Sequence, residues 1–94
     1  MKIHLLAALT ALAVGWWLKL SALEWAIISL TIFFVLAAET FNSAIEVTVD
    51  LVTQERHPLA GRAKDLAAGG VLLAAVNALV VAVLILLPKA LHRL

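Results

Sequence analysis

The sequence contains no cysteine, only four glycines and two prolines, and almost no excess of either charge. Without cysteine, a disulfide framework, a zinc–thiolate site and a cysteine nucleophile are excluded. The formal net charge of +1 is too small for a protein that binds nucleic acid by electrostatic attraction, so no nucleic-acid partner is expected. The glycines are spaced unlike those of a Walker phosphate loop or a dinucleotide-binding fingerprint.

Apolar side chains are abundant instead. They make up 65% of the 94 residues, whereas soluble domains average about 45–50%. A chain this short cannot hide so much apolar surface in one core in water. Its uncharged segments, at 5–18, 25–38 and 66–87, fit membrane-spanning helices once their flanks are included. We therefore predict one all-α membrane domain over 1–94, with three transmembrane helices at about 3–20, 22–52 and 58–87.

Local signals mark the ends of these helices. Ser21 and Glu24 have the spacing of a capping box, which predicts the start of the second helix. Pro58 suits the first turn of the third helix, and Pro88 suits its end. A second helix over 22–52 would be about 46 Å long and would exceed the roughly 30 Å hydrocarbon core. Its C-terminal turns should therefore emerge from the membrane. A signal peptide fits the N-terminal segment less well than a helical hairpin, because its cleavage region would be poor.

Polar side chains crowd into residues 39–65, whereas the rest of the chain is nearly bare. At 100° per residue, Glu39, Asn42, Glu46 and Asp50 form one stripe along one helix face. Like charges at helical spacing repel, and carboxylates near the membrane are costly. A divalent cation would offset both effects, since oxygen ligands suit Mg²⁺. Cations of the next helix, Arg62 and Lys64, would do so as well.

This stripe has two interpretations. It is either a solvated face of an emerging helix or a phosphoryl-transfer site. Glu39 lies directly beside the apolar run, and Asn42 adds an amide that solubility does not require. Carboxylates, Mg²⁺, lysine and arginine together are what phosphoryl transfer uses, because catalysis there is mostly positioning and neutralisation of phosphate charge. A cation conduit is disfavoured, because a conduit needs polar groups across the whole membrane.

Small side chains open the third segment, at Ala63, Ala67, Ala68, Gly69 and Gly70. Such surfaces let membrane helices approach closely. Farther along this segment, Asn77 is strongly polar among apolar residues, and a cross-helix hydrogen bond is expected there.

Two blocks of sequence carry a resemblance. Residues 38–46, AETFNSAIE, followed by Asp50, resemble the E-x-x-N-[ST]-A-I-E-x-x-x-D signature of the prokaryotic diacylglycerol kinase family, which includes undecaprenol kinases. Residues 57–65, HPLAGRAKD, resemble that family's H-x-x-x-x-R-A-K-D segment at the family's spacing. The resemblance covers nearly the whole chain. It implies a small integral membrane kinase that assembles as a homotrimeric helical bundle in the bacterial inner (cytoplasmic) membrane.

The resemblance also implies roles for individual residues. Glu39 would be the general base for the lipid hydroxyl, Asn42 would orient groups in the site, and Glu46 would bind Mg²⁺. The ATP cofactor would lie along residues that line its pocket: Glu46, Asp50, Glu55, Arg56, His57, Lys64 and Asp65. Arg56 stands where relatives often have tyrosine.

The implied reaction is ATP-dependent phosphorylation of a membrane lipid alcohol at the cytoplasmic surface. The blocks around residues 2–4 and 57–60 look more like the undecaprenol branch than the diacylglycerol branch. Family members also carry an amphipathic surface helix and a metal-binding glutamate upstream of the position held here by Met1. We therefore expect the chain to be N-terminally incomplete relative to the family. The alternative is an inactive truncated or degenerate relative that acts as a membrane helical assembly.

Overall fold

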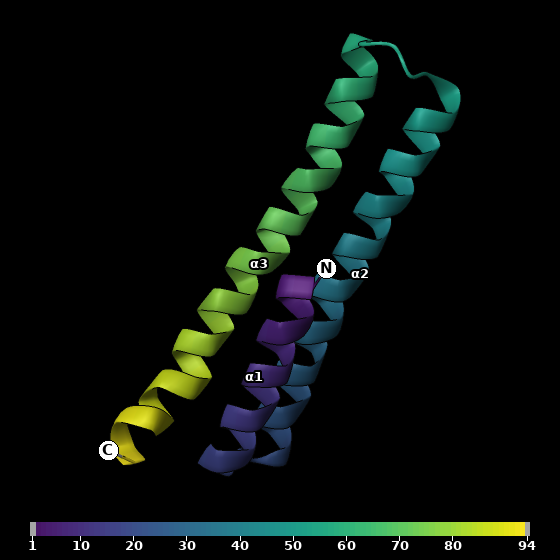
Figure 1. The fold of residues 1–94 in the computed structure, drawn as a ribbon. Helices are drawn as coiled ribbons and strands as arrows, with labels where there is room; N and C mark the ends of the chain where they lie inside the picture. The colour runs from purple at the N-terminus through teal and green to yellow at the C-terminus, as the bar shows by residue number, and fades with distance from the viewer. Residues whose placement is uncertain (1, 94) are drawn as a thin grey trace.

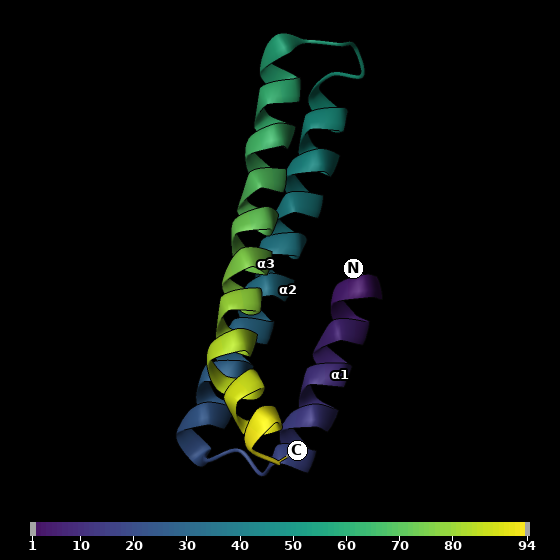
Figure 2. The same cartoon turned by 90° about the vertical axis from the view of Figure 1, so that its left-hand side faces the viewer.

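The computed structural model describes residues 2–93 as three helices and connecting loops, without a strand in that range. The helices are α1 (Lys2–Leu18), α2 (Ala22–Val52) and α3 (Pro58–Arg93). The all-helical prediction is confirmed. Helices α2 and α3 form a long antiparallel hairpin, and α1 packs along one half of it (Figure 1). Viewed from the side, α1 lies beside the hairpin and the C-terminus lies near the turn between α1 and α2 (Figure 2).

The turn between α1 and α2 is fixed by backbone hydrogen bonds. The Lys19 N–H donates to the Trp16 carbonyl and the Leu20 N–H to the Gly15 carbonyl, as in a Schellman motif. Lys19 has φ 58°, a conformation that glycine adopts more readily. Gly15 is required sterically here, because a Cβ on it would lie 2.8 Å from the Trp25 ring. The close approach of helix and turn therefore depends on this glycine.

Helix α2 begins as the sequence predicted. Both hydrogen bonds of the capping box form, from the Glu24 N–H to the Ser21 hydroxyl and from the Ser21 N–H to the Glu24 carboxylate. The helix then runs for 31 residues to Val52, where the Thr53 N–H donates to the Val49 carbonyl.

Helix α3 continues through Pro88 to Arg93, so the predicted end at Leu87 is wrong. A proline removes one backbone hydrogen bond but does not stop a helix whose following turn is held by other contacts. Here Lys89 pairs with Glu24 at 2.7 Å, and the Arg93 guanidinium lies 5.3 Å from the centre of the Trp17 ring. These contacts tie the last turns of α3 to the turn between α1 and α2.

Helices α2 and α3 are long and apolar enough to cross a membrane. The first predicted span, 3–20, is shorter in the structure. Helix α1 has 17 residues and would measure about 26 Å. The buried core is small and centres on Leu18, Leu20 and Ile28, while many large apolar side chains lie on the outside. Such extensive apolar exposure marks a surface that contacts lipid or other protein.

Of the small residues at the start of α3, Ala63 and Ala67 are half-buried, but the two glycines are not in close contact with another helix of the described chain. A Cβ added to Gly69 or Gly70 would meet no atom within 4 Å. Asn77 is exposed, and within residues 2–93 it has no cross-helix hydrogen bond. At Gly69, Gly70 and Asn77, the expected close packing and cross-helix hydrogen bond are therefore not made within residues 2–93.

Candidate active site

The carboxylate stripe lies on α2 and extends from the middle of that helix to its last turn before the loop. Glu39 and Asn42 are half-buried, whereas Glu46 and Asp50 are exposed. From Glu39 to Asp50 the helix rises by roughly 16 Å. Because α1 is shorter than α2, its N-terminal turn lies beside Glu39, and the rest of the stripe projects beyond it (Figure 1). The stripe thus begins within a three-helix region and ends in a two-helix one.

One predicted cation reaches the stripe from the neighbouring helix. The Lys64 ammonium donates to the Asp50 carboxylate across the hairpin, with a 2.7 Å N–O distance. Lys64 precedes the uncharged membrane segment 66–87. Its hydrogen bond to Asp50, together with the negative charge of Asp50 and Glu46, raises the pKa of Lys64 above its ordinary value, against the opposing effect of partial burial. Lys64 therefore carries its positive charge beside the carboxylates.

The loop between α2 and α3 is ordered by short-range hydrogen bonds. The Glu55 N–H donates to the Thr53 hydroxyl at 3.1 Å, and the His57 N–H donates to the Glu55 carbonyl at 2.9 Å. The His57 ring then caps α3, because its Nδ1 accepts the Leu59 N–H at 3.1 Å. Sequence reasoning placed His57 along a nucleotide and missed this capping role.

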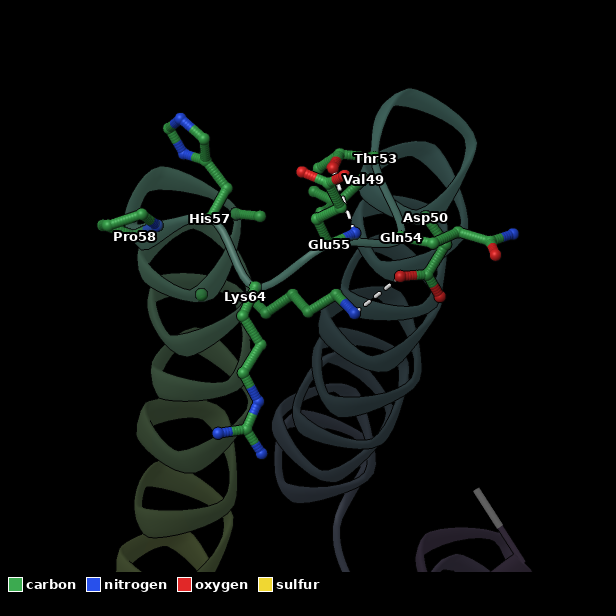
Figure 3. A pocket seen from close by; sticks show the side chains of 11 residues that line it. Val49, Asp50, Thr53, Gln54, Glu55, His57, Pro58 and Lys64 are labelled. Atoms are coloured by element: carbon green, nitrogen blue, oxygen red, sulfur yellow. Dashed lines mark hydrogen bonds and ion pairs between the residues drawn. The ribbon is translucent and has the colours of Figure 1, made fainter.

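A polar cleft of about 500 Å³ lies between this loop and the ends of the two helices. In Figure 3, Lys64 extends from α3 to Asp50 across the cleft, while the His57 ring points away from that pair. The cleft is lined by Val49, Asp50, Thr53, Gln54, Glu55, Arg56, His57, Pro58, Ala60, Gly61 and Lys64.

A second contact joins α1 to the stripe. The His4 Nδ1 atom contacts the Glu39 carboxylate, and the Glu39 side chain is 11% exposed. His4 also lines an apolar cleft of about 300 Å³ between the three helices, which reaches Val35, one turn before Glu39. Sequence reasoning assigned no role to His4. A lone histidine in an apolar run carries no spacing signal for a contact 35 positions away.

The structure thus brings some of the predicted residues together and keeps others apart. Asp50, Glu55, Arg56, His57 and Lys64 share the polar cleft. The remaining predicted residues, Glu39, Asn42, Glu46 and Asp65, do not line it. Within residues 2–93, no three histidine or acidic side chains form a group that could hold a metal.

The structure is a helical hairpin, long and apolar enough to cross a membrane, with a polar cleft at one end. The half-buried Glu39 lies on α2 between that cleft and the apolar one. The family model described as prokaryotic diacylglycerol kinase matches residues 1–86 of this chain. The chain belongs to the prokaryotic diacylglycerol kinase family. The matched range contains all the residues of the stripe and both clefts.

Similar members of the family are named as kinases of lipid alcohols. The chain is 47% identical over 88 residues to the undecaprenol kinase of Bacillus subtilis strain 168. It is 42% identical over 88 residues to a diacylglycerol kinase of Synechocystis and 36% identical over 74 residues to that of Escherichia coli strain K12. These matches cover 94%, 93% and 79% of this chain, and 72%, 50% and 61% of the three relatives. Transfer of phosphate to a lipid alcohol is thus the activity of the family.

Proposed function

We propose that this chain transfers the γ-phosphate of ATP to the hydroxyl group of a membrane lipid at the cytoplasmic surface of the bacterial inner membrane, which it crosses several times. Family membership supports the reaction class. The observation that carries the proposal is the position of Glu39, between an apolar cleft on its membrane side and polar side chains on its other side. A lipid alcohol needs both environments, because its chain is apolar and its phosphate acceptor is polar.

In the proposed reaction Glu39 acts as general base. Its carboxylate takes the proton of the lipid hydroxyl as the hydroxyl oxygen attacks the γ-phosphorus, and the bond to the β-phosphate oxygen breaks to release ADP. Asn42, one turn further along the same face, orients the reacting groups. The half-buried position of both side chains supports these roles, because partial exclusion of water strengthens electrostatic interactions.

Mg²⁺ is proposed to bind at Glu46 together with the nucleotide phosphates. The donor set fits this ion, which prefers oxygen ligands and often uses one or two carboxylates with water and phosphate. The Asn42 Oδ1 atom, one turn from Glu46, is buried and has no hydrogen-bond partner among the described residues. A bound Mg²⁺ would neutralise phosphate charge. Glu46 would hold the phosphates near Glu39 through it.

The nucleotide is proposed to lie along the polar end of the hairpin. Lys64 and Arg56 supply positive charge to the phosphates, and the cleft at the loop offers space for the rest of the nucleotide. Because Asp50 lies roughly 16 Å along α2 from Glu39, the phosphate chain would run along the stripe. The other proposed contacts are Asp50, Glu55, His57 and Asp65.

Undecaprenol is the preferred substrate in this proposal, with diacylglycerol as the alternative. The relative that is 47% identical is named an undecaprenol kinase. The apolar cleft beside His4 suits either lipid chain, so the choice rests on similarity and on the sequence blocks described above.

A homotrimer is the proposed assembly. Gly69 and Gly70 of α3 are open, and Asn77 is exposed within the uncharged segment 66–87. Polar side chains inside membranes usually hydrogen-bond to another helix, so a second copy of the chain is a suitable neighbour. Residues 1–94 would belong to one kinase domain.

Transfer of labelled phosphate from ATP in mixed micelles tests this function. The purified chain receives Mg²⁺ and either undecaprenol or diacylglycerol. We expect labelled lipid product, formed faster with undecaprenol. Faster transfer to diacylglycerol would overturn the substrate preference alone. Failure to label either lipid would overturn the kinase function and favour an inactive assembly.

A further inference from the structure

We propose that His4 is a positioning residue for Glu39: its ring N–H donates to the Glu39 carboxylate and holds the carboxylate towards the lipid hydroxyl. This inference rests on the proposed function, in which Glu39 is the general base. It adds a residue from α1 to a site whose other proposed members lie on α2, on α3 and in the loop between them.

The first observation is the contact itself. His4 lies in the first turn of α1 and Glu39 in the second half of α2, so the contact exists only because the two helices pack antiparallel. The side chains are 30% and 11% exposed. A charge-assisted hydrogen bond of this kind is stronger than a neutral one and gains strength where water is partly excluded. The contact is therefore able to restrict rotation of the carboxylate.

The second observation is the position of His4 at the apolar cleft between the three helices. Two lining side chains carry polar atoms, His4 and Thr31. The Thr31 hydroxyl already donates to the Ile27 carbonyl at 2.7 Å, so it is committed to its own helix. His4 is thus the polar end of this cleft. A lipid whose chain occupied the cleft would bring its hydroxyl group towards His4 and Glu39.

The chemistry favours a positioning role. A histidine that donates through Nδ1 binds one oxygen of a carboxylate and so restrains the orientation of the group. General bases work only when the proton they take lies within hydrogen-bond reach. A displacement of about 1 Å can reduce the rate about 100-fold. A phenylalanine at this position keeps the size of the ring but loses the donor. An asparagine keeps a donor near the position of Nδ1.

The test compares His4→Phe and His4→Asn with the unchanged protein in the lipid phosphorylation assay. We expect His4→Phe to lower kcat by about 10- to 100-fold, with KM for ATP changed less than about twofold, because His4 contacts Glu39 and does not line the polar cleft proposed for the rest of the nucleotide. His4→Asn should recover most of the lost kcat. The matched control is His92→Phe, which changes an exposed histidine beside Leu18, at the other end of α1 from His4, and should leave kcat unchanged.

A second readout does not depend on activity. Nitrogen-15 resonances of the His4 ring should report a hydrogen-bonded Nδ1, and Glu39→Gln should shift that resonance while leaving His92 unaffected. Thermal midpoints of the His4 variants show whether loss of activity follows from unfolding. If His4→Phe and His4→Asn lose equal activity, the donor is not what matters and the proposal is wrong.

The outcomes separate this inference from the kinase function. If the protein without substitutions is active and His4→Phe keeps the full kcat, the proposed role of His4 is wrong and the kinase function stands. If the protein without substitutions phosphorylates neither lipid, the kinase function and the positioning role of His4 are both wrong. In that case the ring resonances would still report whether the His4–Glu39 contact forms.

Discussion

Lys64 on α3 donates to Asp50 on α2 at 2.7 Å, and this ion pair closes the polar end of the hairpin. Its partners come from the two sequence blocks that carry the family resemblance. The Lys64 and Asp50 side chains are 36% and 58% exposed. Exposed ion pairs contribute little to stability, about 0–1 kcal/mol. The pair is therefore better explained by what it offers a ligand than by what it adds to the fold.

Replacing Lys64 should weaken nucleotide binding more than it weakens the fold. We expect Lys64→Gln to raise KM for ATP about tenfold, as expected for loss of about 1.4 kcal/mol of phosphate binding, and to shift the thermal midpoint little. Lys89→Gln is the matched control, since Lys89 makes an ion pair of the same length with Glu24 at the opposite end. Equal KM values for the two variants would contradict a nucleotide site at the hairpin loop.

Glu46 should determine how much Mg²⁺ the reaction needs. With its carboxylate neutralised, the ion loses a charged ligand and the phosphates lose their link to α2. We expect Glu46→Gln to require about tenfold more Mg²⁺ for half-maximal rate, or to be inactive. A titration of rate against Mg²⁺ concentration measures this. An unchanged titration curve would show that Glu46 does not bind the metal. Activity in excess chelator would show that the reaction does not need the metal.

Gly15 should be the least replaceable glycine of the described chain for stability. A Cβ there would lie 2.8 Å from the Trp25 ring and 2.9 Å from the Leu20 side chain, and overpacking of this kind costs about 1–3 kcal/mol. We expect Gly15→Ala to lower the thermal midpoint in detergent. Gly61→Ala is the control, because its Cβ would meet nothing within 4 Å and alanine favours a helix by about 1 kcal/mol. A lower midpoint for Gly61→Ala than for Gly15→Ala would contradict the packing described.

The sequence predicts the helices better than it predicts the contacts between them. Local chemistry defines the start of α2, because the capping box of Ser21 and Glu24 involves residues three positions apart. The end of α3 escapes prediction for the opposite reason, since Pro88 is a local stop signal that distant contacts of Lys89 override. Helical spacing likewise places Glu39 and Asp50 on one stripe.

What the sequence cannot provide is the partner of each group on that stripe. Lys64 is a predictable partner of the stripe that holds Asp50, because both residues lie near one loop, where a hairpin must bring them together. The contact between His4 and Glu39 is not predictable from the sequence, because the register of α1 against α2 depends on packing in the turn around Gly15. The same limit applies to His57, whose use as a cap depends on the backbone path of the loop.

In the proposed reaction, everything depends on Glu39 taking the proton of the lipid hydroxyl. The most direct test compares Glu39→Gln with Glu24→Gln in transfer of labelled phosphate from ATP to undecaprenol. Both changes remove one carboxylate from α2, but Glu24 lies at the opposite end and pairs with Lys89. We predict that Glu39→Gln lowers kcat at least about 100-fold and that Glu24→Gln has the same kcat as the protein without substitutions. Full activity in Glu39→Gln, with its fold intact, would show that Glu39 is not the general base.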